Sequence, residues 1–195
     1  MSAKGSAAIR VVAATPARWD DLVRLFGARG ACAGCWCMWW RRAPAAWRAG
    51  KGTGNRAALR RLVASGDPPG LLAYAGREPV GWIAVAPREA YPRLAGARTL
   101  RPVDDTPVWS VTCFFVAKDY RRRGVTVALL EGAAAYAARR GAVMLEGYPV
   151  EARTGALPDA FAWTGLPGAF RKAGFREVAR PSATRSIVRR ALRRR

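Results

Sequence analysis

The stretch from Val108 to Arg140 constrains the fold of this chain more than any other. Its first part, Val108–Ala117, is dominated by valine and aromatic residues, which predicts a β-strand. Its last part, Val125–Arg140, is rich in alanine and leucine and is followed by Gly141, which predicts a helix that ends there. Simple alternation along the strand places four of its side chains on one face: Ser110, Thr112, Phe114 and Val116.

The turn between the strand and the helix has the features of a phosphate-binding site. It contains Arg121, Arg122 and Arg123, followed by Gly124. The first N–H groups of a helix have no partner within the helix, the helix dipole is positive there, and glycine lets an anion approach the backbone. The turn is neither a Walker loop nor a G-x-G-x-x-G turn. An ordinary turn with surface arginines is the alternative interpretation.

The turn resembles the acyl-CoA signature of the GCN5-related N-acetyltransferase (GNAT) family, Arg/Gln-x-x-Gly-x-Gly/Ala. Arg121, Gly124 and Thr126 stand at its fixed positions, and Val116 stands where the family has a strand-end valine. Phe170–Phe175 resembles the family's late Tyr-x-x-x-Gly-Phe element. Thr126 departs from the signature, which usually has glycine or alanine there. Its side chain either crowds a bound pyrophosphate or donates a hydrogen bond to it.

The resemblance covers roughly residues 71–188 and implies a mixed α/β (α+β) fold. That fold has a central, mostly antiparallel, twisted sheet of about six or seven strands with a splayed parallel pair, flanked by about four helices. The parallel pair corresponds to Val108–Ala117 and Ala142–Pro149. We expect a single acyl-CoA N-acyltransferase domain over residues 1–195, with a basic C-terminal tail at residues 189–195.

The resemblance also implies an activity: direct transfer of an acetyl group, in a ternary complex, from acetyl-CoA to a primary amine of a small molecule or an aminoacyl group. Acetyl-CoA is the expected cosubstrate, and no metal is expected. Backbone groups of Phe114, Phe115 and Val116 are expected to hold the pantetheine arm. The residues expected to hold the pyrophosphate are Arg121, Arg122, Arg123, Gly124, Val125 and Thr126. The expected partners are acetyl-CoA and the amine acceptor, with the protein a monomer or a homodimer.

Catalytic candidates are harder to assign, because the chain has no histidine and departs from the family twice. Ser110 stands where the histone-type branch has a glutamate base, and Phe170 stands where the family often has a tyrosine acid. We therefore consider Glu146 as the base, Tyr148 as the acid, and Ser110 or Thr112 as a residue that holds water. The alternatives are a salt-bridged Glu146 and a core Tyr148 with a satisfied hydroxyl.

The segment Cys32–Arg42 is expected to form a wall of the acceptor site. Trp36, Trp39 and Trp40 offer aromatic faces to a cationic amine, and Tyr91 lies in a connector expected to cover the site. Packing in the core is an equal alternative for this segment. A zinc site formed by its C-x-x-C-x-C cysteines with Cys113 is a further alternative, which the spacing disfavours.

The rest of the chain predicts further elements in a regular order. The expected strands are Ile9–Ala13, Leu71–Ala75, Val80–Ala86, Phe175–Ala179 and Ser186–Arg190. The expected helices run from Pro16 to near Gly27, from Arg56 to Ala64 with Asn55 as the N-cap, and from Leu166 to Ala173. The expected loops are Pro87–Pro107, over the active site, and Glu151–Asp159.

Charge is the main compositional feature, with 34 Lys plus Arg against 13 Asp plus Glu and a net charge of +21. Nucleic-acid binding is therefore an alternative function, although much of the charge is dispersed. A non-catalytic acyl-CoA sensor or interaction module is another, because the family's usual base and acid are missing. No apolar run is long enough for a membrane span, and the N-terminus has no apolar core of a signal peptide, so we expect a cytoplasmic location without membrane contact.

Overall fold

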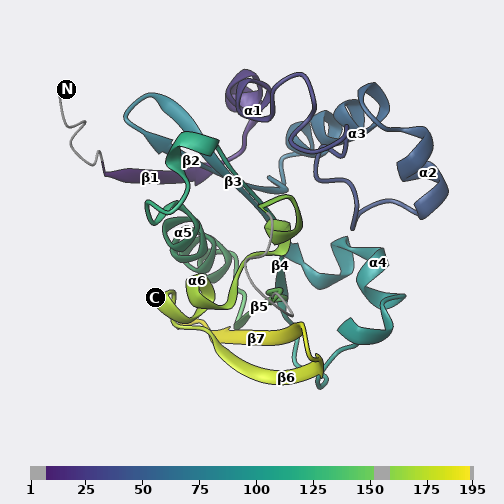
Figure 1. Ribbon diagram of the computed structural model, residues 1–195, viewed down its shortest axis with the longest axis vertical. Helices are drawn as coiled ribbons and strands as arrows, with labels where there is room; N and C mark the ends of the chain where they lie inside the picture. The colour runs from purple at the N-terminus through teal and green to yellow at the C-terminus, as the bar shows by residue number, and fades with distance from the viewer. Residues whose placement is uncertain (1–7, 152–158, 194–195) are drawn as a thin grey trace.

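Seven strands form one sheet in the computed structural model, which describes residues 8–151 and 159–193 (Figure 1). The strands are β1 Ile9–Ala13, β2 Gly70–Ala75, β3 Glu78–Pro87, β4 Trp109–Val116, β5 Met144–Gly147, β6 Arg176–Ser182 and β7 Arg185–Ala191. Their order across the sheet is β1-β2-β3-β4-β5-β7-β6. Every neighbouring pair is antiparallel except β4 and β5, which are parallel. The expected mixed sheet with one parallel pair is therefore confirmed.

Helices cover both faces of this sheet. The α-helices are α1 Trp19–Phe26, α2 Pro44–Ala49, α3 Thr53–Ala64, α4 Pro92–Ala95, α5 Val125–Arg139 and α6 Pro167–Lys172. Short 3-10 helices also occur, among them η1 Pro16–Arg18, η2 Arg88–Ala90, η3 Arg98–Leu100, η4 Lys118–Tyr120 and η5 Asp159–Thr164. Helix α5 packs against β1, β2 and β3, with α6 beside it, whereas α1 packs against the other face of β3 (Figure 1).

Three expectations about these elements need correction. Helix α3 begins at Thr53 with Gly52 at its N-cap, so Asn55 lies inside the first turn instead of capping the helix. The connector Pro87–Pro107 folds into η2, α4 and η3 instead of an open loop. Strand β7 continues to Ala191, so Arg189 and Arg190 belong to the sheet and not to a basic tail. The expected loop Glu151–Asp159 lies largely outside the described residues.

The buried apolar residues form three clusters. The first lies between the sheet and α5 and α6, and includes Val111, Phe114, Leu129, Leu130 and Phe170. The second lies on the opposite face, under α1 and α3, and includes Leu22, Phe26, Trp36, Leu59 and Trp82. The third, which covers the β5 and β7 end of the sheet, includes Tyr91, Leu94, Leu100, Tyr148 and Ile187. The connector therefore packs on the sheet instead of standing over an open site.

A β-bulge interrupts β4 in its middle. Val111 and Cys113 oppose the consecutive β3 residues Val85 and Ala84, so Thr112 is one extra residue on β4. A bulge places successive side chains on the same face and resets the alternation beyond it. Accordingly Phe114 packs in the cluster under α5, whereas Phe115 packs beside the cluster under α1. The predicted shared face of Ser110, Thr112, Phe114 and Val116 is therefore wrong.

The parallel pair separates soon after it begins. Strands β4 and β5 pair only at Trp109↔Leu145, Ser110↔Glu146 and Val111↔Gly147. The rest of β4, Thr112–Val116, extends past the end of β5 and pairs along its other edge with β3. Among the described residues, the side of β4 that faces away from β3 therefore has no strand partner from the bulge onward.

No helix within residues 8–151 and 159–193 has both the length and the apolar character that a membrane crossing requires.

Candidate functional site

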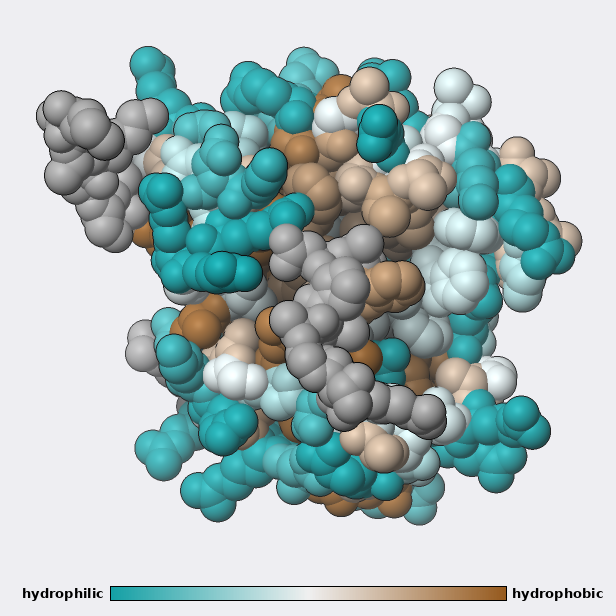
Figure 2. All heavy atoms as spheres, in the orientation of Figure 1, coloured by the Kyte–Doolittle hydropathy of each residue, from teal (hydrophilic) through white to brown (hydrophobic). Residues whose placement is uncertain are grey.

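A cavity of about 1320 Å³ lies along the unpaired side of β4. Its residues come from the loop after α1, α2, the second half of β4, the turn before α5, η5 and α6. Figure 2 shows apolar residues gathered about the middle of this face of the molecule, with hydrophilic residues toward its upper and lower edges. The lining is therefore mostly apolar and includes Trp39, Trp40, Trp47, Cys113, Phe114, Phe115, Val116, Gly124, Thr126, Trp163 and Lys172.

The turn Arg121–Thr126, here called the cradle, forms one part of this lining. Gly124 is the N-cap of α5 and has a φ of 79°, in the left-handed region that glycine tolerates. Arg122 also has a positive φ, 60°, which is strained for a residue with a side chain. Helix α5 starts at Val125, so the N–H groups of its first turn have no helical partner. Left-handed residues at a helix start turn backbone donors toward one point, which suits an anion.

The residues expected to hold acetyl-CoA lie close together around the cradle. All of them line the cavity except Arg123, whose guanidinium carbon lies 5.7 Å from the Tyr120 ring centroid. The Nε of Arg121 donates to the carbonyl of Val116 over 3.2 Å, which ties the cradle to the end of β4. Thr126 lines the cavity and is half-buried, and a β-carbon built on Gly124 would meet no atom within 4 Å. The cradle is thus open.

The residues expected to form the acceptor wall divide into two groups. Trp39 and Trp40 line the cavity, but Trp36 does not. The ring of Trp36 packs in the core, with its centroid 5.5 Å from that of Phe26. Tyr91 is also buried away from the cavity, and its hydroxyl accepts a hydrogen bond of 3.1 Å from Arg41. Trp36 and Tyr91 therefore pack in the core and do not line the cavity.

Two further tryptophans line the cavity that were not predicted from the sequence. Trp47 lies on α2, and its ring centroid is 4.8 Å from that of Trp39 in an edge-on arrangement. Trp163 lies on η5, 5.8 Å from Trp40. We call these four residues the tryptophan wall. Pro44 at a helix start was a usable signal for α2, but Trp163 reaches the wall through a long-range contact that no local pattern encodes.

The loop between α1 and α2, which carries Trp39 and Trp40, has an unusual backbone conformation. Four of its non-glycine residues have positive φ angles: Ala31, Ala33, Trp36 and Cys37. The fully buried Asn55 holds this loop, because its Nδ2 donates to the carbonyls of Gly34 and Trp47, each over 3.2 Å. Its Oδ1 accepts a hydrogen bond of 2.8 Å from Arg42. One amide side chain therefore fixes the loop relative to α2 and α3.

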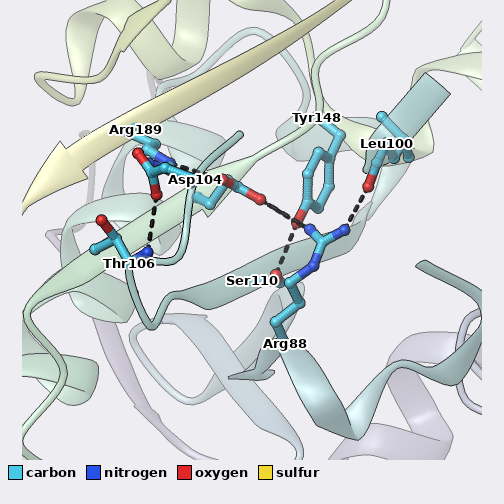
Figure 3. Close-up of polar contacts among 8 residues, drawn as sticks. Arg88, Leu100, Asp104, Thr106, Ser110, Tyr148 and Arg189 are labelled. Atoms are coloured by element: carbon cyan, nitrogen blue, oxygen red, sulfur yellow. Dashed lines mark hydrogen bonds and ion pairs between the residues drawn. The ribbon is translucent and has the colours of Figure 1, made fainter. Parts of the chain in front are cut away.

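The three catalytic candidates meet one another, but outside the cavity lining (Figure 3). The Tyr148 hydroxyl lies 2.8 Å from the Oγ of Ser110 and donates to Oε1 of Glu146 over 2.7 Å. Arg88 donates to the same Oε1 over 2.9 Å and to Tyr148 over 2.6 Å. Burial, followed by the charge of Glu146, raises the pKa of Tyr148. Tyr148 is therefore neutral and fully hydrogen-bonded.

A second arginine closes this group, which we call the Glu146 network. The Nε of Arg189 donates to Oε2 of Glu146 over 2.7 Å, and its Nη1 donates to Asp104 over 2.7 Å. Arg88 also donates to the Leu100 carbonyl (Figure 3). Each oxygen of the Glu146 carboxylate thus accepts from a guanidinium group, and its side chain is 1% exposed. A carboxylate held in this way is poorly placed to take a proton from an amine, which corresponds to the salt-bridged alternative for Glu146.

Two cysteines of the cavity, Cys35 and Cys37, lie in surroundings that raise the pKa of their thiols. Cys37 Sγ lies 3.2 Å from Cys113 Sγ, and this contact together with burial raises the pKa of Cys37 well above its usual value. Burial also raises the pKa of Cys35. A raised pKa leaves less of the nucleophilic thiolate, which disfavours an acyl-enzyme on Cys35 or Cys37. Within the described residues, no group of three or more Cys, Asp or Glu is arranged to hold a metal ion.

Comparison with solved structures gives the same architecture. A GNAT-family acetyltransferase from Streptococcus agalactiae is similar with a TM-score of 0.56 and 14% identity, over 95% of this chain and 96% of that chain. The GNAT domain of PAT from S. lividans gives a TM-score of 0.55 and 18% identity, over 94% and 90%. The PaiA N-acetyltransferase from Thermoplasma acidophilum, solved in complex with coenzyme A, gives 0.52 and 12%, over 94% and 99%. At these identities the likeness establishes the fold alone.

Sequence comparison supplies the family. A comparison with curated protein sequences gave no match. The family model described as the acetyltransferase (GNAT) family matches residues 36–156, which is more than half of the chain. The matched range contains both β4 and the cradle. The chain therefore belongs to the GNAT family of acetyltransferases.

Proposed function

We propose that this protein is an N-acetyltransferase that moves an acetyl group from acetyl-CoA to a primary amine of a small molecule, directly and in a ternary complex. The proposal treats residues 1–195 as one acyltransferase domain. The observation that carries it is the combination, in one cavity, of an unpaired strand edge and an anion-binding turn. Bound acetyl-CoA would supply the acetyl group as a reactive thioester.

The residues of the cavity fit such a ligand. The unpaired backbone of Thr112–Val116 offers hydrogen bonds to a chain that carries amide groups, as the pantetheine arm does. The N–H groups at Val125 and Thr126 and the charge of Arg122 suit a diphosphate. Lys172, at the end of α6, also lines the cavity and adds a further positive charge. The described side chains that line this space include no carboxylate.

The main contribution of the protein to the reaction is to position the thioester and the amine. Holding two reactants in one cavity removes much of the entropic cost of their encounter. The apolar wall lowers the stability of a charged ammonium and so favours the neutral, nucleophilic amine. With Glu146 and Tyr148 outside the lining, we propose that the Glu146 network holds β4, β5 and β7 in register, and that water takes the amine's proton.

Calorimetric titration with acetyl-CoA tests the first half of the proposal. We expect saturable binding that Arg121→Glu and Gly124→Glu both weaken. Arg61→Glu changes the net charge as Arg121→Glu does, but at an exposed position of α3 outside the cavity, so it should bind acetyl-CoA almost normally. Absence of heat at millimolar acetyl-CoA, or equal loss in Arg61→Glu, would show that the cradle is not a binding site.

A non-catalytic acyl-CoA sensor is the second candidate, favoured by the lack of a carboxylate in the lining. Release of free CoA thiol, measured across a panel of primary amines, separates the two: amine-dependent release supports the enzyme, and binding without release supports the sensor. Nucleic-acid binding gains no support, because Arg189 of the expected basic tail is buried between Glu146 and Asp104.

A further inference from the structure

The tryptophan wall bears on the kind of amine that the cavity accepts. Its four indoles come from three separate segments, and each is half-buried and lines the cavity. The neighbouring lining consists of small or weakly polar residues, among them Ala31, Cys35, Cys37 and Ala162. Aromatic rings and thiols bind an apolar body well, and they offer no ion pair to a charged one.

Two of the four indoles in this wall, Trp39 and Trp47, already contact the protein's own cations. The guanidinium carbon of Arg93 lies 3.6 Å from the ring centroid of Trp39. The ammonium of Lys51 lies 4.9 Å from the ring centroid of Trp47. A cationic ligand approaching the opposite face would be repelled by a charge held just behind the ring. Of the residues expected to attract a cationic amine, Trp36, Trp39 and Trp40, this observation weighs against Trp39.

The positive charge behind the wall is poorly compensated. Nη1 of Arg93 is buried and has no hydrogen-bond partner among the described residues. Burial and the nearby charge of Arg48 lower the pKa of Arg93, as expected for a cation in a positive environment. In the part of the chain that the structure describes, neither Arg93 nor Lys51 forms a salt bridge with an Asp or Glu.

Because the wall is apolar and backed by cations, we propose that the acceptor is a monoamine with an aromatic or otherwise apolar body and no second positive charge. This inference rests on the proposed N-acetyltransferase function and names the substrate class of the same cavity. A polyamine or a guanidino-amine would bury a charge with no partner, which is costly. A monoamine leaves only the reacting nitrogen, which must lose its charge before it attacks.

The experiment uses two amines that differ by one group. In para-ethylbenzylamine a methyl group stands where para-xylylenediamine carries a second ammonium. We expect kcat/KM to be higher for the monoamine by about tenfold or more, which corresponds to about 1.4 kcal/mol. Quenching of tryptophan fluorescence by each amine, with CoA present, gives a binding readout that does not depend on turnover, and it should show the same order.

A carboxylate added to the cavity lining should reduce the preference for the monoamine. Ala33 lines the cavity, is exposed and has a φ of 47°, a conformation that Asp and Asn adopt more readily than Ala. Ala33→Asp should narrow the preference for the monoamine by about threefold or more, because it adds a carboxylate to the lining. Ala33→Asn has nearly the same shape without the charge and should leave the preference unchanged.

The outcomes separate this inference from the proposed function. Equal binding of the two amines, a preference for the diamine, or no quenching by either would overturn the inference even if acetyl-CoA binds normally. Failure of acetyl-CoA to bind would overturn the proposed function, and the quenching order measured without CoA would still decide whether the wall selects against a second charge.

Discussion

Replacing Glu146 by Gln should destabilise the fold far more than a typical substitution. Its carboxylate accepts from both Arg88 and Arg189 and is almost completely buried. The amide keeps the shape but removes the charge, so the largely buried Arg88 guanidinium loses its counter-charge and Arg189 keeps only its ion pair with Asp104. Breaking a buried pair in this way costs about 3–5 kcal/mol. With a urea m-value of about 2.5 kcal/mol/M, the unfolding midpoint should fall by about 1–2 M.

Equilibrium urea unfolding, followed by circular dichroism, measures this shift. Asp67→Asn removes one carboxylate from an exposed pair with Arg140 and is the matched control, whose midpoint should move much less. Steady-state kinetics of the same Glu146→Gln protein, at a temperature where it remains folded, then report on catalysis. We expect kcat to stay within about tenfold of the parent, because Glu146 lies outside the cavity lining.

The reasoning would be refuted by the opposite pattern. A midpoint that moves by less than about 0.4 M would mean that the network contributes less than about 1 kcal/mol. If kcat fell at the same time by about a hundredfold or more, Glu146 would act as a general base. The sequence-based assignment of Glu146 as the base would then be correct, and the Glu146 network would adjust the reactivity of its carboxylate.

Three further expectations follow from single contacts. Asn55→Ala leaves the carbonyls of Gly34 and Trp47 without their donor, so it should cost about 2–4 kcal/mol in urea unfolding and raise the KM for the amine; an unchanged KM would mean that Asn55 does not position the wall. Burial, followed by the hydrogen bond to Asp21, raises the pKa of Tyr74 to about 12. The folded state thus keeps a proton that the unfolded chain loses near pH 10, so the stabilisation is complete below pH 10 and is lost as the pH rises through about 12. Tyr74→Phe should flatten that decline in unfolding experiments between pH 9 and pH 11, and a parallel decline in both proteins would contradict the assignment. Thr126→Val should weaken acetyl-CoA binding by about tenfold in calorimetry if the hydroxyl donates to phosphate, whereas tighter binding by Thr126→Ala would indicate crowding instead.

The cradle could be predicted from the sequence, because its residues are contiguous in the chain. The cradle is a contiguous strand, turn and helix, and residues such as Gly124 mark it without reference to the rest of the chain. Strand and helix periodicity also placed β4 and α5 within a residue or two of their observed ends. The boundaries differ more at the start of α3, which begins at Thr53 instead of Arg56, and in β5, which is shorter than the expected strand Ala142–Pro149.

The remaining parts of the site depend on contacts between distant residues. Glu146 is held by Arg88 and Arg189, which lie far from it in the chain, so its sequence neighbours do not reveal that it is paired. Trp36 and Trp39 are the same residue type and lie three positions apart, yet Trp39 lines the cavity and Trp36 is buried in the core. The left-handed backbone at Trp36 separates them, and neither helical nor strand periodicity can anticipate such a residue.

The extra residue at Thr112 acts on β4 as a change of phase. Before it, odd-numbered side chains such as Val111 face α5; after it, even-numbered ones such as Phe114 do. Deleting Thr112 would make Val111 and Cys113 consecutive residues opposite Val85 and Ala84, a regular pairing in which Phe114 still faces α5 and Phe115 still faces the opposite core. A single lost codon at this position would therefore be less damaging than one at Phe114, whose loss would turn Phe115 toward α5 and misdirect the side chains that follow it.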